Sequence, residues 1–492
     1  MEDTTTKVRP QRYCFDISGI VDFLENHHEY TGIQRVVAMA ASGFYAVMPE
    51  ENKSDVYVGF HDRITGRYKC ASFAKVENVI EHADLLSEVL PIRSKYSATK
   101  KYIIPFLDKY KSNMVKYYFH LWRLDALAFF KQDANFLKMN TDSKGWKQIR
   151  GGQPEAVKSK AKIDLTDFSK IFEANDVLFL LDAAWQTSHA NIIKKIYSKG
   201  IKTLTMVHDL VPLKVIGYTD PSIPGGFTNW LLNTNTHTTA YLAISNNTHN
   251  DLREFLSSIS VEKDIHNVPL VQSFNHIKRE DSALGALSEK LSKEVYPDFS
   301  EVITLDKSIR KYLHTPFILC VGTIEIRKNP LRLIQAWKQL IKRSNGDIPK
   351  LVFAGRMGWL VDDFKAALEA SGNLFGYVDV ILLPTDQELS FLYRNCLFAM
   401  MPSLYEGWGL PVGEALSLGK TAVVSHSSSL SEVGRDLVKY CDPTSVSSIE
   451  EAVWQLFSEP QHRIDLENRI KLTKLRSWHD VGTDLCEIAK KV

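Results

Sequence analysis

The sequence predicts an α/β protein with two Rossmann-like domains that face each other across a cleft. The chain has 492 residues, 44% of them hydrophobic. This length exceeds the size at which a single hydrophobic core stops growing, so two domains are expected. Short apolar runs also alternate with helical patterns in two separate regions, which is typical of βαβ units and parallel sheets.

In the first region, short hydrophobic runs each lead into polar residues, as the strands of a parallel sheet do. Ligands bind outside the carboxyl ends of such strands, so we expect these ends to line one crevice. The expected strands are Tyr13–Ile17, Val56–Phe60, Val177–Leu181, Thr203–Val207 and Leu242–Ser245.

The second region repeats this pattern more regularly, and its apolar runs are separated by helical stretches such as Pro330–Lys342. It therefore predicts a second parallel sheet. The expected strands are Phe317–Val321, Lys350–Ala354, Val378–Leu383, Phe398–Pro402 and Thr421–Ser425.

A charged, serine-rich stretch near residues 271–309 separates the two regions. We therefore predict a first domain over residues 1–290 and a second over residues 291–475, followed by a C-terminal helix over residues 476–492. Residues 78–162 are helical, basic and aromatic in pattern, and a minimal Rossmann domain does not need them. They are expected to be an insertion in the first domain. The last stretch, 461–491, is helical and amphipathic around Trp478.

Composition excludes several classes of protein. The formal net charge of +2 gives no global field that would attract nucleic acid. The six cysteines stand far apart without a CxxC pair, which predicts buried thiols in a reducing cytoplasm rather than a metal site. The N-terminus is acidic and polar, and no stretch approaches the roughly 20 apolar residues of a membrane helix. We expect a cytoplasmic protein that is neither exported nor membrane-spanning.

The strongest motif is PSLYEGWGLPVGEAL, residues 402–416, which follows an expected strand and runs into a helix. Seven residues separate its two carboxylates, Glu406 and Glu414. Gly407 and Gly409 permit close approach of the backbone to a ligand, and the N–H groups that open the helix form an anion site. A sugar diphosphate fits this pattern. The alternative is an ordinary strand–turn–helix with two solvated glutamates.

This motif resembles that of glycosyltransferase family 4, whose members carry Glu-x7-Glu in this context. The similarity continues through residues 425–443 and covers nearly the whole second domain. It implies a retaining GT-B glycosyltransferase similar to bacterial mannosyl- and rhamnosyltransferases of group 1. It also implies that Glu406 contacts the hydroxyls of the donor sugar and Glu414 those of the ribose. The residues implied to line the sugar and phosphate are Gly407, Trp408, Gly409 and Leu410.

A second motif, VGTIEIRKNP at residues 321–330, follows another expected strand. Gly322 turns the chain, and Arg327 and Lys328 place positive charge where a departing pyrophosphate gains negative charge. By resemblance they are the diphosphate-binding pair. Many relatives have an arginine directly after the glycine, whereas this chain has Thr323, so the pair is expected to bind without it. The alternative is a basic helix start.

The first domain supplies VHDLVPL, residues 207–213, at the end of an expected strand. His208 and Asp209 resemble the pair that family members aim at the donor sugar. With Glu406 they are the predicted catalytic residues, although a structural histidine is the alternative. The remaining expectations are that Gly32 of TGIQRVV admits the diphosphate, that Arg35 reaches an acceptor or phosphate, that Asp182 and Trp185 line an acceptor cleft, and that Leu389 and Tyr393 pack rather than bind.

No two aspartates are separated by a single residue, so the Asp-x-Asp that holds a divalent metal in the other main transferase fold is missing. We expect no metal and no cofactor, because Arg327, Lys328 and helix N-termini supply the electrostatic stabilisation. The favoured mechanism of the family is front-face attack without an enzyme nucleophile.

The co-substrate is expected to be a GDP-, UDP- or dTDP-linked sugar, and the sequence does not distinguish the three. The resemblance favours GDP-mannose or a deoxyhexose donor. The acceptor is expected to be a glycan or lipid-linked glycan in the synthesis of a bacterial surface polysaccharide such as lipopolysaccharide. Two alternatives are a nucleotide-sugar epimerase of the same fold and a non-catalytic nucleotide-sugar-binding protein.

Residues 93–131 contain nine basic residues against two aspartates, a local net charge of +7, interleaved with ten aromatic residues. Basic and aromatic side chains together suit the surface of an anionic membrane. One interpretation is therefore peripheral contact with the inner face of the membrane, where a lipid-linked acceptor would be met. The other is a helical insertion whose aromatic side chains pack on the first domain and whose lysines are solvated.

Overall fold

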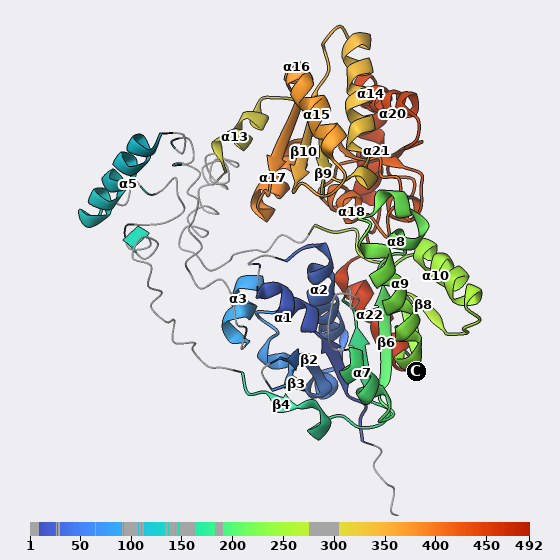
Figure 1. Ribbon diagram of the computed structural model, residues 1–492. Helices are drawn as coiled ribbons and strands as arrows, with labels where there is room; N and C mark the ends of the chain where they lie inside the picture. Colours follow the sequence, from blue (N-terminus) through green and yellow to red (C-terminus); the bar gives the residue numbers. More distant parts are fainter. Residues whose placement is uncertain are drawn as a thin grey trace, which may run out of the picture.

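The structure is a computed structural model with two α/β domains joined in one chain (Figure 1). It describes residues 9–25, 27, 30–63, 65–90, 92, 107, 110, 113–132, 136, 143, 146–147, 163–182, 190–274 and 305–492. Within these residues, no helix is long and apolar enough to cross a membrane. All six cysteines lie among them, buried and free of disulfides, as the sequence predicted.

The described part of the first domain contains an eight-stranded sheet in the order β4-β3-β2-β1-β5-β6-β7-β8. From β2 through β1 to β8, neighbouring strands pair in parallel. At one edge of the sheet, β3 pairs antiparallel with β2 on one side and with β4 on the other. All five expected strands are present, with ends shifted by at most two residues. The strands are β1 (Tyr13–Asp16), β2 (Val56–Asp62), β3 (Arg67–Ser72), β4 (Thr166–Asp167), β5 (Val177–Leu180), β6 (Lys202–Val207), β7 (Ala240–Ala243) and β8 (Ile265–Asn267).

The antiparallel edge was not predicted. Strand β3 returns along β2 after a tight turn in which Gly66 has a φ of +66°, a conformation that glycine adopts without steric cost. Its six residues are only partly apolar, so the hydrophobic pattern at the edge of the sheet was too weak to indicate a strand.

The second domain contains, among its described residues, a parallel six-stranded sheet in the order β11-β10-β9-β12-β13-β14. The five expected strands are again present, and only the short edge strand β14 was missed. The strands are β9 (Phe317–Val321), β10 (Lys350–Gly355), β11 (Val378–Leu382), β12 (Ala399–Met401), β13 (Ala422–Ser425) and β14 (Lys439–Cys441).

Helices cover the sheets of both domains, whereas α5 stands apart from them (Figure 1). Those of the first domain are α1 (Ser18–Leu24), α2 (Gly32–Val47), α3 (Ala83–Val89), α5 (Met114–Phe129), α7 (Ala190–Tyr197), α8 (Val211–Lys214), α9 (Ile223–Thr234) and α10 (Asn246–Ser258). Those of the C-terminal half are α13 (Lys307–Arg310), α14 (Pro330–Arg343), α15 (Asp362–Ala370), α16 (Gly372–Phe375), α17 (Asp386–Asn395), α18 (Leu410–Ser417), α19 (Leu430–Gly434), α20 (Val446–Ser458), α21 (Pro460–Leu472) and α22 (Trp478–Ala489).

The helical stretch near the C-terminus consists of two helices, and the second of them, α22, lies within the helix predicted over residues 476–492. Helix α21 ends at Leu472, and α22 begins after Ser477, whose hydroxyl accepts a hydrogen bond from the N–H of Asp480 in a capping box. Helix α22 lies against α2 of the first domain (Figure 1). A Cβ atom on Gly43 would lie 2.3 Å from the Trp478 carbonyl oxygen, so the two backbones approach closely. The end of the chain therefore returns to the first domain.

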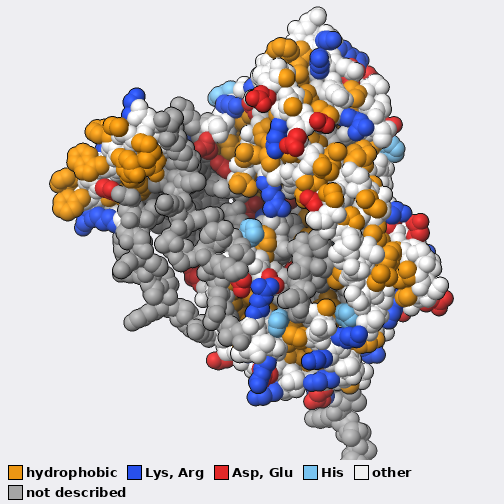
Figure 2. All heavy atoms as spheres, in the orientation of Figure 1, with side chains coloured by type: hydrophobic (Ala, Val, Ile, Leu, Met, Phe, Trp, Pro, Cys, Tyr) orange, Lys and Arg blue, Asp and Glu red, His pale blue; other side chains and the backbone are white. Residues whose placement is uncertain are grey.

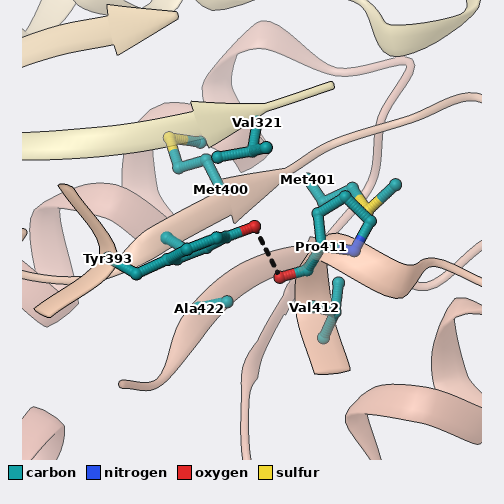
Figure 3. A pocket seen from close by; sticks show the side chains of 8 residues that line it. Val321, Tyr393, Met400, Met401, Pro411, Val412 and Ala422 are labelled. Carbon is teal, nitrogen blue, oxygen red and sulfur yellow. Dashed lines mark hydrogen bonds between the residues drawn. The ribbon is translucent and has the colours of Figure 1, made fainter. Parts of the chain in front are cut away.

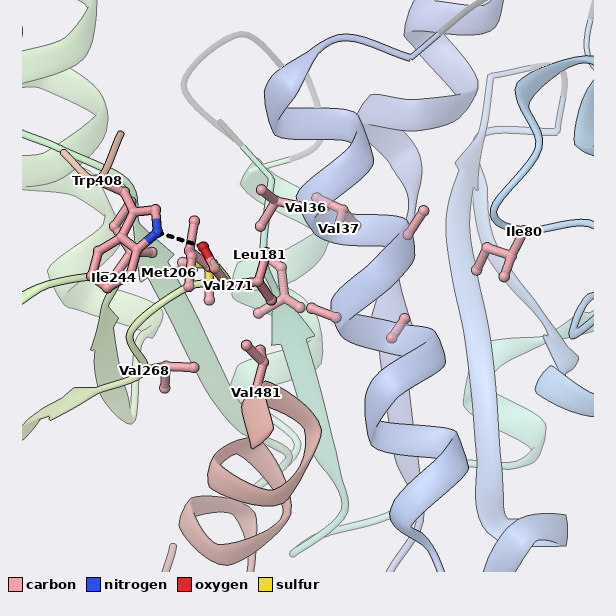
Figure 4. Packing of buried hydrophobic residues seen from close by; sticks show 14 of the residues in the cluster. Val36, Val37, Ile80, Leu181, Met206, Ile244, Val268, Val271, Trp408 and Val481 are labelled. Atoms are coloured by element: carbon pink, nitrogen blue, oxygen red, sulfur yellow. Dashed lines mark hydrogen bonds between the residues drawn. The ribbon is translucent and has the colours of Figure 1, made fainter. Parts of the chain in front are cut away.

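The largest hydrophobic cluster extends through both domains. Figure 4 shows part of it, where Trp408 of the second domain meets Met206 and Ile244 of the first. The Trp408 indole Nε1 donates a 2.9 Å hydrogen bond to the Val271 carbonyl oxygen, which lies on the segment that leaves the first domain. The two domains thus share buried apolar surface, which favours a closed arrangement.

Candidate active site

Predicted site residues from both domains meet where the two sheets present the carboxyl ends of their strands. His208 and Asp209 follow β6, Arg327 and Lys328 lie after β9, and Glu406 follows β12. Ligands bind outside the carboxyl ends of parallel strands. The arrangement therefore brings together residues that the sequence places about 200 positions apart.

Glu406 lies between the two cations of the second domain. Its Oε2 is 2.6 Å from Arg327 Nη1 and its Oε1 is 2.6 Å from Lys328 Nζ, and only 7% of the residue is exposed. Burial raises the pKa of the Glu406 carboxyl, but the two cations outweigh burial and lower the pKa to about 2. Arg327 also contacts the Glu325 carboxylate at 2.6 Å. Sequence reasoning identified Glu406, Arg327 and Lys328 without predicting that they bind one another, and it missed Glu325.

His208 is held by its own domain. Its Nε2 lies 2.8 Å from the Leu181 carbonyl oxygen, and a carbonyl only accepts hydrogen bonds, so Nε2 carries the proton. Burial lowers the pKa of His208, which leaves the ring neutral near pH 7. Neutral His208 therefore has an acceptor atom at Nδ1. Asp209 accepts a 3.0 Å hydrogen bond from the Val211 N–H, and burial raises its pKa against the opposing effect of Arg327.

Gly407 makes the closest approach between the two halves of the site. A Cβ atom there would lie 2.2 Å from the His208 carbonyl oxygen and 2.8 Å from Asp209 Cβ. Real Cβ contacts are essentially never this short. Glycine at position 407 therefore lets Glu406 face His208 and Asp209 across the domain boundary.

Glu414 is positioned by a tyrosine that we expected only to pack. Tyr393 on α17 is fully buried, and its hydroxyl donates a 2.8 Å hydrogen bond to Glu414 Oε2. It also lies 3.3 Å from the Pro411 carbonyl oxygen, beside a small apolar gap lined by Val321, Met401 and Val412 (Figure 3). Burial raises the pKa of the Glu414 carboxyl. Tyr393 thus packs, as expected, and its hydroxyl also orients Glu414, the residue predicted to bind the ribose.

Trp408 was predicted to line the site for the sugar and phosphate, but its side chain points into the core between the domains. The indole is 6% exposed and is hydrogen bonded to Val271 in the core between the domains. Gly409 has a φ of +120°, and a Cβ there would lie 2.6 Å from Leu430 Cδ2. Leu410, the first residue of α18, packs against the same core. These residues fix the turn before α18, while Gly407 within that turn lies against the His208 backbone.

The other predicted residues of the first domain lie on helix α2 and after strand β5. Gly32 is its first residue, and a Cβ added there meets no atom within 4 Å. Arg35 Nη2 lies 2.9 Å from the Asp386 carboxylate at the start of α17. Asp182 is buried at the end of β5 beside Gly19, so close that a Cβ on Gly19 would overlap its carboxylate. Trp185 lies outside the described residues.

Gly322 turns the chain after β9 with a φ of +131°, as predicted. A Cβ there would lie 3.7 Å from Lys328 Cε, which shows that the lysine side chain lies beside the end of the strand. Among the described residues, no group of three or more His, Cys, Asp or Glu side chains could hold a metal ion.

The chain is similar to known glycosyltransferases in sequence and in fold. Residues 302–473 match the family described as Glycosyl transferases group 1. Residues of this chain are 33% identical to O-antigen chain mannosyltransferase B of Escherichia coli over 168 positions, which cover 34% of this chain and 44% of that protein. Serotype-specific mannosyltransferase WbdA of Escherichia coli is 22% identical over 289 residues, 58% of this chain and 33% of that protein. The chain thus spans less than half the length of these relatives.

The crystal structure of Anabaena Alr3699/HepE in complex with UDP and glucose superimposes with a TM-score of 0.52. The match has 9% sequence identity and covers 98% of this chain and 100% of that one. The fold is GT-B.

Polar contacts across the boundary hold the two halves of this GT-B fold together, and sequence reasoning missed them. Glu432 on α19 accepts hydrogen bonds from the backbone N–H groups of Asn246 (2.8 Å) and Asn247 (2.9 Å) at the start of α10. A carboxylate at a helix N-terminus is stabilising. The Tyr405 hydroxyl also hydrogen bonds to the Asp251 carboxylate on α10. Such pairs join residues about 150 to 190 positions apart, so no local spacing in the sequence signals them.

Proposed function

We propose that this protein is a retaining glycosyltransferase of the family 4 type, which transfers a hexose or deoxyhexose from a nucleotide sugar to a glycan or lipid-linked glycan. The observation that carries the proposal is the ion-pair cluster of Glu406 with Arg327 and Lys328, which faces His208 and Asp209 across the cleft. Two partly exposed cations beside a carboxylate suit a ligand that combines a diphosphate with sugar hydroxyls.

The second domain is proposed to hold the donor. Arg327 and Lys328 would contact the diphosphate, whose negative charge grows as the glycosidic bond breaks. Glu414, oriented by Tyr393 at 2.8 Å, would accept hydrogen bonds from the ribose hydroxyls. The cationic pair would thereby do what a divalent metal does in other transferases, and we propose that the reaction needs no metal cofactor.

The first domain is proposed to act on the reacting sugar. The neutral His208 ring, with its proton on Nε2, would accept a hydrogen bond at Nδ1 from a donor hydroxyl. The acceptor hydroxyl would attack from the face that the diphosphate leaves, and the leaving phosphate would take the acceptor proton. No nucleophile of the enzyme is needed for this front-face step.

Mannose is the donor sugar that the relatives favour, because the matched proteins carry the name mannosyltransferase. We therefore propose GDP-mannose as the first donor to test. The name of the first of these relatives, O-antigen chain mannosyltransferase B, supports a glycan or lipid-linked glycan acceptor in surface polysaccharide synthesis.

The test is incubation of the purified chain with GDP-mannose, UDP-glucose or dTDP-rhamnose, followed by mass spectrometry. Binding of one donor with slow release of its nucleoside diphosphate is expected, and His208→Ala should abolish the release while retaining binding. NMR of a transferred product should show the anomeric configuration of the donor. An isomerised nucleotide sugar would identify an epimerase, and binding without turnover in the presence of oligosaccharides would identify a non-catalytic binding protein.

A further inference from the structure

Helix α5 carries large apolar side chains on a face that no described residue covers. Figure 1 shows the helix standing apart from both sheets, and Figure 2 shows hydrophobic side chains gathered on its outer side. Val115 is 80% exposed and Trp122 is 67% exposed. The other large exposed side chains of this region are Met114, Tyr118, Phe119, Phe129 and Phe130.

The exposed residues form one stripe along the helix. Val115, Phe119, Trp122 and Phe129 are spaced by three, four or seven residues, which places them on the same side of an α-helix. We call this set, with Tyr118, the aromatic face. The interpretation that these aromatic side chains pack on the first domain is therefore wrong for α5.

The opposite side of α5 is already occupied. Leu121, Leu124 and Ala128 are buried in a small cluster with Phe136 and Trp146. The Trp146 indole also donates a 2.8 Å hydrogen bond to the Asp125 carboxylate. Because the packing of α5 uses this second face, the aromatic face is not needed to hold the helix in place.

Positive charge borders the aromatic face. Lys116 and Arg123 are exposed on α5, and Lys131 follows the helix directly. Lys147 Nζ lies 5.9 Å from the centre of the Phe129 ring. The acidic residue of the described helix is Asp125, which is engaged by Trp146. An apolar stripe with a cationic border matches the interface of an anionic bilayer, where aromatic rings lie at headgroup level and basic residues contact the lipid charge.

We propose that the aromatic face of α5 docks on an anionic lipid surface. Phe119, Trp122 and Phe129 insert at the level of the headgroups, while Lys116 and Arg123 contact the anionic lipids. A second copy of the chain fits this face less well. Symmetric antiparallel pairing would bring the two copies of Arg123 together, because this residue lies near the middle of α5.

The proposal does not depend on the proposed reaction, since the binding surface contains none of the donor-site residues. In the cell such docking would present the cleft to an acceptor carried by a lipid. If the proposed activity failed and lipid binding persisted, the docking surface would stand alone.

The experiment is flotation of the full chain with vesicles of phosphatidylcholine alone or with increasing phosphatidylglycerol, without donor or acceptor. Binding is expected to rise with the anionic lipid fraction and to fall with added salt. Phe119→Ser combined with Trp122→Ser should lower the partition coefficient about tenfold or more. Lys116→Glu combined with Arg123→Glu should abolish the dependence on phosphatidylglycerol.

The matched control removes two equally exposed apolar side chains from the second domain. Phe375 is 78% exposed and Leu472 is 90% exposed, so the Phe375→Ser, Leu472→Ser variant should float like the unchanged chain. Circular dichroism confirms that each variant folds. The proposal is overturned if the unchanged chain stays unbound at every lipid composition, or if the two double variants of α5 bind like the control. A monomer–dimer equilibrium that Trp122→Ser abolishes, without lipid binding, would assign the face to a second copy.

Discussion

Lys328 Nζ lies 2.6 Å from the Glu406 carboxylate. The lysine that we propose to bind the diphosphate is therefore already paired with a carboxylate of its own domain. Arg327 approaches the other oxygen of the same group at 2.6 Å. Glu406 therefore neutralises the cations that a nucleoside diphosphate would otherwise contact. A bound diphosphate must share these cations with Glu406.

The first prediction follows from this sharing. Glu406→Gln removes the negative charge and keeps the shape, so free GDP or UDP should bind more tightly, on the order of tenfold. Sugar transfer should fall, because a contact to the reacting sugar is lost in the transition state. Isothermal titration calorimetry and steady-state kinetics measure the two effects. Glu450→Gln, which breaks the ion pair with Arg343 far from the site, should change neither. Weaker diphosphate binding in Glu406→Gln would contradict the sharing.

The second prediction concerns acid stability. The pKa of Glu406 is about 2 in the folded protein and about 4.3 in an unfolded chain. A depressed pKa stabilises the folded state by about 3 kcal/mol above the unfolded value, and this contribution disappears as the pH falls towards about 2. The stability advantage of the unchanged chain over Glu406→Gln, measured by urea unfolding, should therefore shrink by about half between about pH 7 and about pH 3. If the difference in unfolding free energy between the two proteins did not change with pH, the lowered pKa of Glu406 would be contradicted.

The third prediction concerns the hydroxyl of Tyr393. Tyr393→Phe removes the 2.8 Å hydrogen bond to Glu414, which opposes the effect of burial on the Glu414 pKa. The pKa of Glu414 should therefore rise further in this variant. As the pH is lowered, its nucleotide affinity should begin to fall at a higher pH than that of the unchanged chain. KM for the donor should increase about tenfold with kcat retained, since a ribose contact binds ground and transition states alike. Glu414→Ala should show the same pattern more strongly.

Tyr377→Phe is the control for this prediction. Its hydroxyl donates a 2.8 Å hydrogen bond to the Gly346 carbonyl oxygen, away from the donor site. The variant should leave the pH profile of nucleotide binding unchanged. If the two phenylalanine variants behave alike, Tyr393 is only a packing residue.

The fourth prediction compares two glycines of the cleft. Gly407→Ala places a Cβ 2.2 Å from the His208 carbonyl oxygen, so the domains must separate and transfer should drop by at least about a hundredfold. Gly32→Ala meets no atom of the protein within 4 Å and should fold normally. If Gly32 admits the diphosphate, its variant should raise KM for the donor and keep the melting temperature. Small-angle scattering should show a larger radius of gyration for Gly407→Ala than for Gly32→Ala. Equal radii of the two variants would contradict the forced separation of the domains.

The fifth prediction is that transfer is independent of metal. The sequence has no Asp-x-Asp, and Arg327 and Lys328 supply positive charge at the leaving group. EDTA should leave the initial rate unchanged. Loss of activity with EDTA and its return with Mg²⁺ or Mn²⁺ would refute the proposed role of the two cations.

Local pattern was sufficient for the central strands of both sheets. Strand β9 was predicted at its observed bounds, Phe317–Val321, because buried parallel strands are short apolar runs bounded by polar residues. The edge strands β4, β8 and β14 were missed, since each has only two or three residues and so carries little hydrophobic pattern. The C-terminal helix predicted over residues 476–492 contains α22, Trp478–Ala489, which begins after the cap at Ser477.

The sequence by itself singled out the residues that we propose carry the chemistry. His208, Arg327, Lys328 and Glu406 each follow a predicted strand, and the strand ends of parallel sheets are where ligands bind. Only the tertiary structure decided how these residues pair. The contacts of Glu406 with Lys328, of Gly407 with His208 and of Glu432 with α10 join segments whose distance in space no local spacing encodes. Local propensity acts over a few residues. The contact of Glu406 with Lys328 depends on the pairing of β9 and β12 within one sheet, and the other two contacts depend on how the two domains pack against each other.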